Sequence, residues 1–141
     1  MSGGKFFLDT NIFVYAFDPV AKTKSRVADR LIKEALSSGK GVISYQVAQE
    51  FLNVATRQFA NLMSTAEAEQ HLNRVLHPLL RVHSSKELYV EALHLQSRYK
   101  FSWYDSLIVA AALQAECELL LSEDLQHGQK IGSLRIENPF L

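Results

Sequence analysis

The feature that most constrains the fold is a pair of short, largely apolar runs that each lead toward an acidic residue. Lys5–Leu8 ends at Asp9, and Glu118–Leu121 is followed three residues later by Asp124. Apolar runs of this length without polar alternation are typical of strands buried on both faces, as in a parallel sheet covered by helices. The sequence therefore favours an α/β fold in which acidic side chains follow the strands.

Helical patterns alternate with further short strands along the rest of the chain. The other expected strands are Val42–Ile43, Leu80–Val82 and Leu134–Ile136. One helix is expected over residues 22–38, and a second begins after its cap Ser44. A third begins at the capping box Ser64-x-x-Glu67 and runs to about Leu76, with Pro78 beyond its end. Two more begin at Ser84-x-x-Glu87, running to about Tyr99, and at Ser102-x-x-Asp105. This alternation predicts a three-layer α/β/α sandwich with a short, mainly parallel sheet of about four or five strands.

Length and charge limit the domain organisation and the possible partners. The 141 residues contain no long linker, so residues 1–141 are expected to form a single domain. The 15 basic and 15 acidic residues give a net charge of zero, which excludes a strongly basic nucleic-acid-binding tail. Cys117 is the only cysteine, so no internal disulfide can form. Without a signal-peptide pattern or a run approaching ~20 apolar residues, a cytoplasmic protein without membrane contact is expected.

Sheet topology brings together acidic residues that are far apart in the sequence. The carboxyl ends of parallel strands lie at one edge of a sheet, so Asp9 and Asp124 are expected there. A helix that leads into a parallel strand begins at the same edge, which places Asp105 beside them. Glu50 lies on the apolar face of the helix after Val42–Ile43, about 9 Å from the edge at ~1.5 Å per residue. Four carboxylates are therefore expected in one crevice.

Such a cluster requires positive charge. Neighbouring carboxylates raise one another's pKa, and burying them without a partner costs free energy. No lysine or arginine directly neighbours any of the four in sequence, although folding can bring one near. Mg²⁺ or Mn²⁺ fits, because both cations favour carboxylate and water ligands. A water bound to such a cation has a lowered pKa and can attack a phosphodiester, so the cluster indicates metal-dependent phosphodiester hydrolysis with one or two metals.

Four short motifs surround these acids in a fixed order. They are residues 7–12 around Asp9, residues 44–51 around Glu50, residues 104–112 around Asp105 and residues 120–125 around Asp124. In this order and spacing they resemble the motifs of the PIN-domain family, in particular the VapC-type toxin ribonucleases of toxin–antitoxin systems. The resemblance covers nearly the whole chain.

The resemblance implies a PIN-like nuclease that cleaves single-stranded or structured RNA with Mg²⁺ or Mn²⁺. Its catalytic and metal-binding residues would be Asp9, Glu50, Asp105 and Asp124, with Asn11 and Ser122 as supporting polar residues. It also implies a homodimer and a cognate antitoxin protein as partner. Glu123 is an alternative fourth acid, and the spacing from Ser122 favours Asp124.

Each of these residues also has a purely structural interpretation. Asp9 can cap a helix over residues 11–17, Asp105 fits a capping box, and Asp124 suits an ordinary turn. Glu50 resists this interpretation, because Glu on an apolar stripe is rare without a partner. The six basic and two acidic residues between Lys22 and Lys40 are either a solvated helix face or a track for phosphates. Trp103 and Tyr104 either pack in the protein or stack on bases.

Three other functions fit parts of the pattern. A receiver-type signalling domain also binds Mg²⁺ at strand ends, but it needs a lysine after the last strand, which residues 134–138 lack. An aspartyl-phosphate phosphotransferase would use Asp9 as its nucleophile, but it requires a second Asp where this chain has Asn11. A PIN-like protein that acts mainly as a binding module is the third, and the intact set of four acids favours an enzyme over it.

Overall fold

The computed structural model describes residues 3–59 and 61–141, and it confirms the α/β architecture. Within these residues a six-stranded sheet has the order β3-β2-β1-β4-β6-β5, in which only β5 runs antiparallel to its neighbour. The strands are β1 (Phe6–Leu8), β2 (Gly41–Ser44), β3 (Leu80–Val82), β4 (Leu119–Leu121), β5 (Lys130–Ile131) and β6 (Leu134–Glu137). The sheet thus has one strand more than the sequence predicts.

The additional strand is β5, which has only two residues and forms a hairpin with β6. Ile131 pairs with Leu134, so the hairpin turn consists of Gly132 and Ser133. Gly132 has a φ of 61°, a backbone conformation that glycine adopts at little cost. A strand this short carries no hydrophobic periodicity, which is why the sequence pattern does not indicate it.

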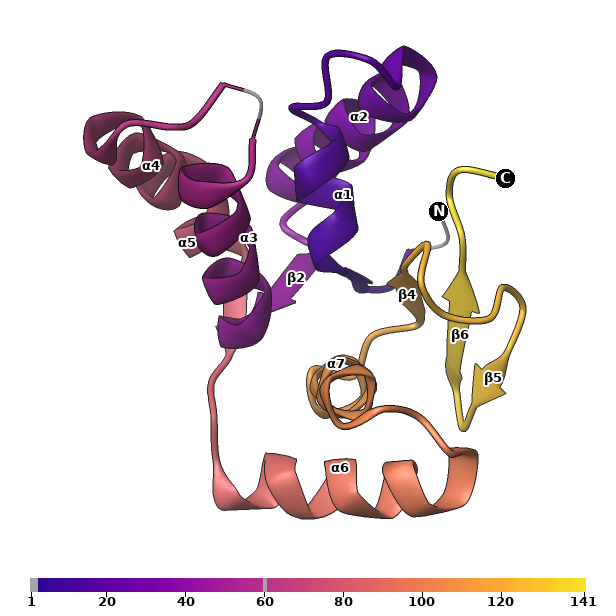
Figure 1. Cartoon of the computed structure of the whole chain (residues 1–141). Coiled ribbons are helices and arrows are strands. Elements are labelled where there is room, and N and C mark those ends of the chain that lie inside the picture. Colours follow the sequence, from indigo (N-terminus) through magenta and orange to yellow (C-terminus); the bar gives the residue numbers. More distant parts are fainter. Residues whose placement is uncertain (1–2, 60) are drawn as a thin grey trace.

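Helices cover both faces of the sheet (Figure 1). Helices α1 and α2 lie on one side, α7 packs on the other, and α6 packs against α7. Helix α3 contacts α1 and the β2–β3 end of the sheet, which gives the expected three layers. The helices are α1 (Thr10–Tyr15), α2 (Lys22–Ser38), α3 (Tyr45–Arg57), α4 (Thr65–His71), the π-helical segment η1 (Leu72–Leu76), α5 (His77–Leu79), α6 (Lys86–Tyr99) and α7 (Trp103–Gln114).

The centre of the sheet is buried on both faces, as the apolar runs predict. Every residue of β1 and β4 is at most 5% exposed. The cysteine at position 117 is buried just before β4, which fits a small apolar side chain, and burial raises the pKa of its thiol to about 11. In the described part of the chain, no helix has the length and apolar character needed to cross a membrane.

The helix that begins at Ser64 extends further than the sequence predicts. The capping box of Ser64 and Glu67 is confirmed. The helix does not stop before Pro78, however, because η1 leads directly into α5, which contains that proline. In η1 the N–H of His77 bonds to the carbonyl of Leu72, five residues back. This wider turn precedes a residue that has no N–H to donate, so the chain stays helical through Leu79.

The N-terminal caps of two helices, α6 and α3, also differ from those that the sequence predicts. Helix α6 is capped by Ser85, whose hydroxyl accepts from the N–H of Leu88, and the expectation of a box at Ser84 is wrong. Leu88 is among the residues that α6 buries, so packing sets where this helix begins. Ser44 occupies the cap position of α3, but its buried hydroxyl makes no cap hydrogen bond and has no partner in the described residues.

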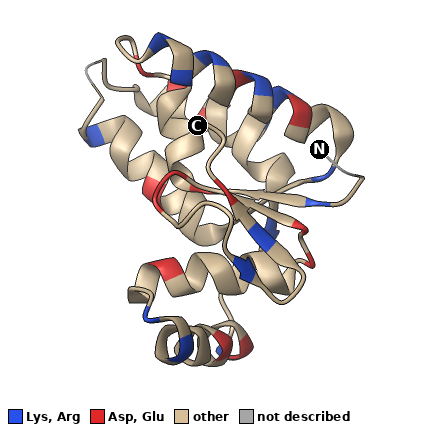
Figure 2. Ribbon diagram, turned by 90° about the vertical axis from the view of Figure 1, so that its right-hand side faces the viewer, with Lys and Arg blue, Asp and Glu red and all other residues tan. Residues whose placement is uncertain are grey.

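The basic segment at positions 22–40 includes the whole of α2 and the turn after it. Figure 2 shows several Lys and Arg residues along this helix with fewer Asp and Glu residues among them. Lys33 forms an ion pair with Asp29 at 2.8 Å, both largely exposed. Mixed charges of this kind fit a solvated helix face, and one lysine of the segment has a different role that is described below.

Gly41 begins β2 directly against Ala35, a buried residue of α2. A Cβ atom at this position would lie 2.8 Å from the Cα atom of Ala35, so the helix backbone would have to shift. We therefore expect Gly41→Ala to lower the free energy of unfolding by about 1–3 kcal/mol, as measured by urea denaturation. Adding Ala35→Gly should recover part of the loss. Wild-type stability in the single variant would contradict this packing.

Candidate active site

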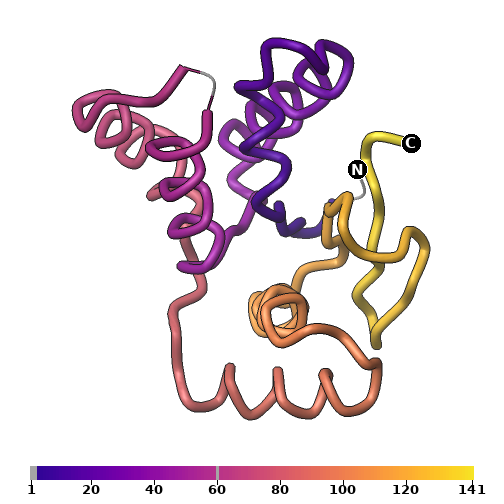
Figure 3. Tube along the Cα trace, viewed as in Figure 1, coloured from indigo at the N-terminus to yellow at the C-terminus, as the bar shows by residue number. Residues whose placement is uncertain are grey.

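The four predicted acids line one pocket at the carboxyl edge of β1 and β4. Its volume is about 520 Å³, and Asn11 lines it as well. In Figure 3 the chain that follows β4 passes beside the segment between β1 and α1, although the two are more than 100 positions apart. The pocket lining consists of Asp9, Thr10, Asn11, Val14, Tyr15, Gln46, Glu50, Asn53, Val54, Tyr104, Asp105, Ile108, Glu123 and Asp124.

A larger hollow of about 650 Å³ lies next to this pocket and shares Val14 and Val54 with it. Its lining is mainly apolar, and the only acids among its described lining residues are Asp18 and Glu67. The N–H groups of Val20 and Ala21 donate to Asp18, and Glu67 belongs to the capping box of α4, so both acids are used in local structure. The smaller acidic pocket is therefore the candidate site.

Asp9 combines the structural and the functional interpretation. It caps α1, since its Oδ1 accepts from the N–H of Thr10 at 2.7 Å. Its Oδ2 accepts from the hydroxyl of Ser122 at 2.7 Å, and the residue is only 5% exposed. Burial raises the pKa of Asp9 to about 6, against these hydrogen bonds, and the neighbouring Asp124 and Glu50 add to the rise.

Glu50 enters the pocket from α3, where the sequence places it. The hydroxyl of Thr10 donates to its Oε1 at 2.6 Å. The side-chain amide of Gln46 lies 3.4 Å from its Oε2 and also donates to the carbonyl of Tyr104 at 3.2 Å. Neither Thr10 nor Gln46 has a role among the sequence predictions. Gln46 could have been found, because it lies four residues before Glu50 on the same helix face.

Asp105 lies in the first turn of α7. Ser102 caps this helix and accepts from the N–H of Asp105 at 3.2 Å, so the capping interpretation of Ser102 is confirmed. Burial raises the pKa of the Asp105 carboxyl, and the nearby Asp124 raises it further. The acid therefore takes part in a helix start and also lies among the pocket carboxylates.

The two expected supporting residues connect the acids to one another. Ser122 is fully buried, donates to Asp9, and accepts from the N–H of Asp124 at 3.1 Å. The side-chain amide of Asn11 donates to Oδ2 of Asp124 at 3.1 Å, and its oxygen accepts from the N–H of Glu123 at 3.4 Å. These contacts hold the loop after β4 against the start of α1.

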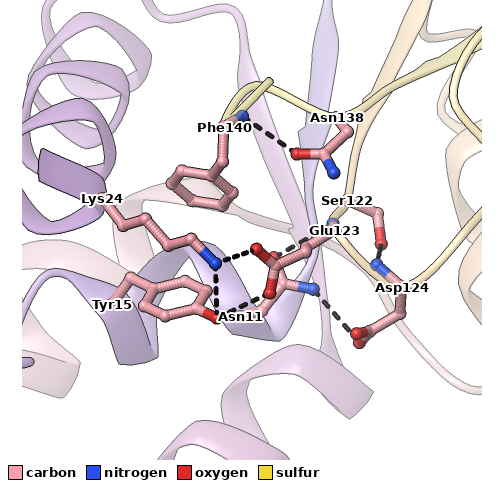
Figure 4. A network of polar contacts seen from close by, with 8 residues as sticks. All are labelled: Asn11, Tyr15, Lys24, Ser122, Glu123, Asp124, Asn138 and Phe140. Atoms are coloured by element: carbon pink, nitrogen blue, oxygen red, sulfur yellow. Dashed lines mark hydrogen bonds and ion pairs between the residues drawn. The ribbon is translucent and has the colours of Figure 1, made fainter. Parts of the chain in front are cut away.

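Glu123 and Asp124 have different surroundings (Figure 4). Glu123 accepts from Tyr15 and forms an ion pair with Lys24 on α2, both at 2.6 Å. Burial acts to raise the pKa of Glu123, but the hydrogen bonds from Lys24 and Tyr15 outweigh it and the pKa is lowered. From the sequence, Lys24 is only one of the basic residues of the segment at 22–40 and Tyr15 has no predicted role, since nothing in their spacing relates them to the loop after β4.

The chemistry of the pocket lining fits a hard divalent cation. Five lining residues are carboxylates, and the described residues of the lining include no Lys, Arg or His. Carboxylate oxygens are the ligands that Mg²⁺ and Mn²⁺ prefer. Within the described chain, no three His, Cys, Asp or Glu side chains already stand close enough to hold a metal ion. Like charges repel, so carboxylates that lack a cation between them are expected to stay apart.

Comparison with known proteins places the chain in a known family. Residues 6–130 match the PIN domain. None of the curated protein sequences compared with the chain matches it at a significant level.

Solved structures with the same fold include a toxin–antitoxin complex and a toxin. A toxin–antitoxin complex from Klebsiella pneumoniae is 21% identical, with a TM-score of 0.68 over 96% of this chain and 98% of that chain. VapBC2 from Rickettsia felis, bound to a fragment of its promoter DNA, is 18% identical, with a TM-score of 0.63 over 94% and 97%. VapC20 from Mycobacterium tuberculosis, a sarcin–ricin loop cleaving toxin, is 19% identical, with a TM-score of 0.58 over 82% and 87%. At these identities the likeness is one of fold.

Proposed function

The chain belongs to the PIN-domain family, and on the basis of its acidic pocket we propose that it is a metal-dependent ribonuclease, the toxin of a toxin–antitoxin pair. The observation that carries the proposal is the meeting of four carboxylates from four separate chain segments in one pocket, whose described lining residues include no Lys, Arg or His. Asp9, Glu50, Asp105 and Asp124 would hold Mg²⁺ or Mn²⁺. Such a cation supplies a water of lowered pKa and positive charge for the phosphate.

The other pocket residues orient these acids. Ser122 and the N–H of Thr10 hold both oxygens of Asp9. The hydroxyl of Thr10 also orients Glu50, and Asn11 orients Asp124. Fixed carboxylates favour metal binding, because little rotamer freedom remains to be lost when the cation enters.

The same contacts speak against a phosphotransferase that uses Asp9 as its nucleophile. Asp9 is 5% exposed, and each of its oxygens already accepts a hydrogen bond. An attacking carboxylate must be open to in-line approach by the phosphorus, which the buried Asp9 is not, and the second Asp that this chemistry requires is Asn11 in this chain.

The similar structures support a proposal for the substrate and partners. VapC20 is a toxin that cleaves the sarcin–ricin loop, and another similar structure is a toxin–antitoxin complex. We infer that this chain cleaves RNA in single-stranded or structured regions and is inhibited by a cognate antitoxin protein. The homodimer that the resemblance implies stays a prediction.

Cleavage of a mixed RNA pool tests the proposed function. We expect cleavage with Mg²⁺ or Mn²⁺, none with EDTA, and a rate reduced by about 100-fold or more in Asp105→Asn, which keeps the side-chain shape but removes one charge. Asp29→Asn, which removes an acid from the exposed face of α2, is the matched control and should cleave like the wild type.

Two outcomes would change the proposal in different ways. Cleavage in EDTA, or an undiminished rate in Asp105→Asn, would contradict the mechanism. A wild-type protein that binds Mn²⁺ through these acids but cleaves no RNA would contradict the substrate and leave the metal site.

A further inference from the structure

The loop after β4 presents two adjacent acids to different surroundings. Both oxygens of Glu123 are engaged: Oε1 accepts from the hydroxyl of Tyr15 and Oε2 pairs with Nζ of Lys24, each at 2.6 Å. Nζ of Lys24 also donates to the hydroxyl oxygen of Tyr15 at 3.2 Å, which closes a three-membered network. Figure 4 shows Glu123 turned toward this network and Asp124 turned away from it.

Aromatic rings surround the lysine of this network. Nζ of Lys24 lies 4.7 Å from the centre of the Tyr15 ring and 5.8 Å from that of Phe140. The two rings pack edge to face at 5.0 Å. Phe140 is held in place through Asn138, whose side-chain oxygen accepts from the N–H of Phe140 at 2.9 Å. The ammonium group therefore lies beside two aromatic faces and is directed at Glu123.

The network fixes one end of the loop whose other end carries Asp124. The N–H of Glu123 is bonded to Asn11, and the N–H of Asp124 is bonded to Ser122, which also holds Asp9. With Glu123 anchored to α2, the next side chain is directed to the pocket, where it contacts Asn11. Lys24 itself does not line the pocket.

We propose that Lys24 is a positioning residue: both Glu123 and Asp124 line the pocket, and the ion pair of Lys24 with Glu123 fixes the loop of residues 122–124 so that Asp124, and not Glu123, serves as the fourth ligand. The inference rests on the proposed function, because it assigns Lys24 a role in preparing a metal site. It explains how a chain with two adjacent acids at this position uses one as a ligand and the other as an anchor.

Positioning and simple charge effects predict opposite results. A lysine close to an anionic pocket repels a cation, so on charge alone its removal would tighten the binding of Mn²⁺. If Lys24 positions Asp124, its removal loosens the loop and weakens the binding of Mn²⁺. Removal of outer residues that orient metal ligands typically lowers metal affinity by about 10–100-fold.

The test is the affinity of the full chain for Mn²⁺, measured by titration calorimetry, with no RNA present. We expect Lys24→Met to weaken Mn²⁺ binding by about tenfold or more and Lys24→Arg to restore most of it, because arginine keeps the ion pair. Lys33→Met is the matched control, since it removes the same charge from the exposed face of α2 and should bind like the wild type. Equal or tighter binding by Lys24→Met would overturn the proposal.

The same titration compares the two acids. Asp124→Asn should lose more Mn²⁺ affinity than Glu123→Gln, because the first removes a ligand and the second only weakens an anchor. The reverse order would overturn the proposal and identify Glu123 as the ligand.

A metal-independent measurement separates this inference from the proposed function. In EDTA, hydrogen exchange of the Glu123 and Asp124 amides should be faster in Lys24→Met than in the wild type and restored in Lys24→Arg. Unchanged exchange would overturn the positioning role even if no variant binds Mn²⁺. If the wild type binds no Mn²⁺ but the two amides exchange faster in Lys24→Met than in the wild type, the result would contradict the proposed function alone. It would still support the positioning of the loop by Lys24.

Discussion

Asp9→Asn is expected to make the metal-free protein more stable at pH 8, by about 2 kcal/mol. Burial raises the pKa of Asp9 from 3.8 to about 6, so the ionised form is disfavoured in the folded state. A rise of this size corresponds to about 3 kcal/mol of lost stability at pH 8. Asparagine removes this loss, and its altered hydrogen bond with Ser122 costs about 1 kcal/mol in return.

The sign of the pH dependence follows from the proton count. Between pH 4 and pH 6 the folded state holds the Asp9 proton more tightly than the unfolded state does, so the stability of the wild type falls as the pH rises through this window. Below pH 4 both states are protonated and the advantage of the variant disappears. The difference between Asp9→Asn and the wild type isolates Asp9 from the other carboxylates.

Urea denaturation in EDTA at several pH values from 4 to 8 measures this difference. Added Mn²⁺ is the control that connects stability to the proposed function: it should stabilise the wild type and leave Asp9→Asn nearly unchanged, because binding to the folded state alone raises stability. If Asp9→Asn is less stable than the wild type at pH 8 in EDTA, the claim that the ionised carboxylate of Asp9 destabilises the folded state is contradicted. A stabilisation that does not vary with pH would exclude the titration of Asp9 as its cause.

Phe51→Ala is expected to lower the free energy of unfolding by about 3–5 kcal/mol. Phe51 is fully buried on α3, directly after Glu50. Its ring centre lies 6.3 Å from that of Phe13, 5.8 Å from Phe17, 5.9 Å from Phe59 and 4.7 Å from His71. The cluster joins α1, α3 and α4, so its loss removes contacts from three elements and leaves a cavity among them.

The expected loss is a large part of the 5–15 kcal/mol that stabilises a typical domain. Urea denaturation midpoints and slopes measure it. Phe59→Ala is the matched control, because Phe59 packs at the edge of the same cluster and is only partly buried, so its loss should be smaller. Equal losses in the two variants would show that Phe51 is not the centre of the cluster.

The accuracy of the sequence predictions varies with the physical signal behind each element. Helix α2 is predicted over its full observed range, because its apolar face has a clear helical period and Gly39 ends it. The strand at 130–131 is missed, because two residues carry no period. The helix through Pro78 is cut short, because the usual rule for proline takes no account of a π-helical turn before it.

In the candidate site, too, the features that have a local sequence signal could be predicted and the others could not. The gathering of Asp9, Glu50, Asp105 and Asp124 could be predicted, since strand ends of a parallel sheet and the starts of the helices that lead into them lie at one edge. The contact of Lys24 with Glu123 could not, because the two are 99 positions apart and no local rule relates them.

The sequence by itself determined the family, the layered α/β fold and the acids of the pocket, because alternating apolar periods and acid-bearing motifs are local properties of the chain. Only the tertiary structure decided the surroundings of each acid. It buried Asp9 beneath Ser122, gave Glu50 the hydroxyl of Thr10, and turned Glu123 to Lys24. These contacts set the direction of each carboxylate, and they depend on packing between segments that are distant in sequence.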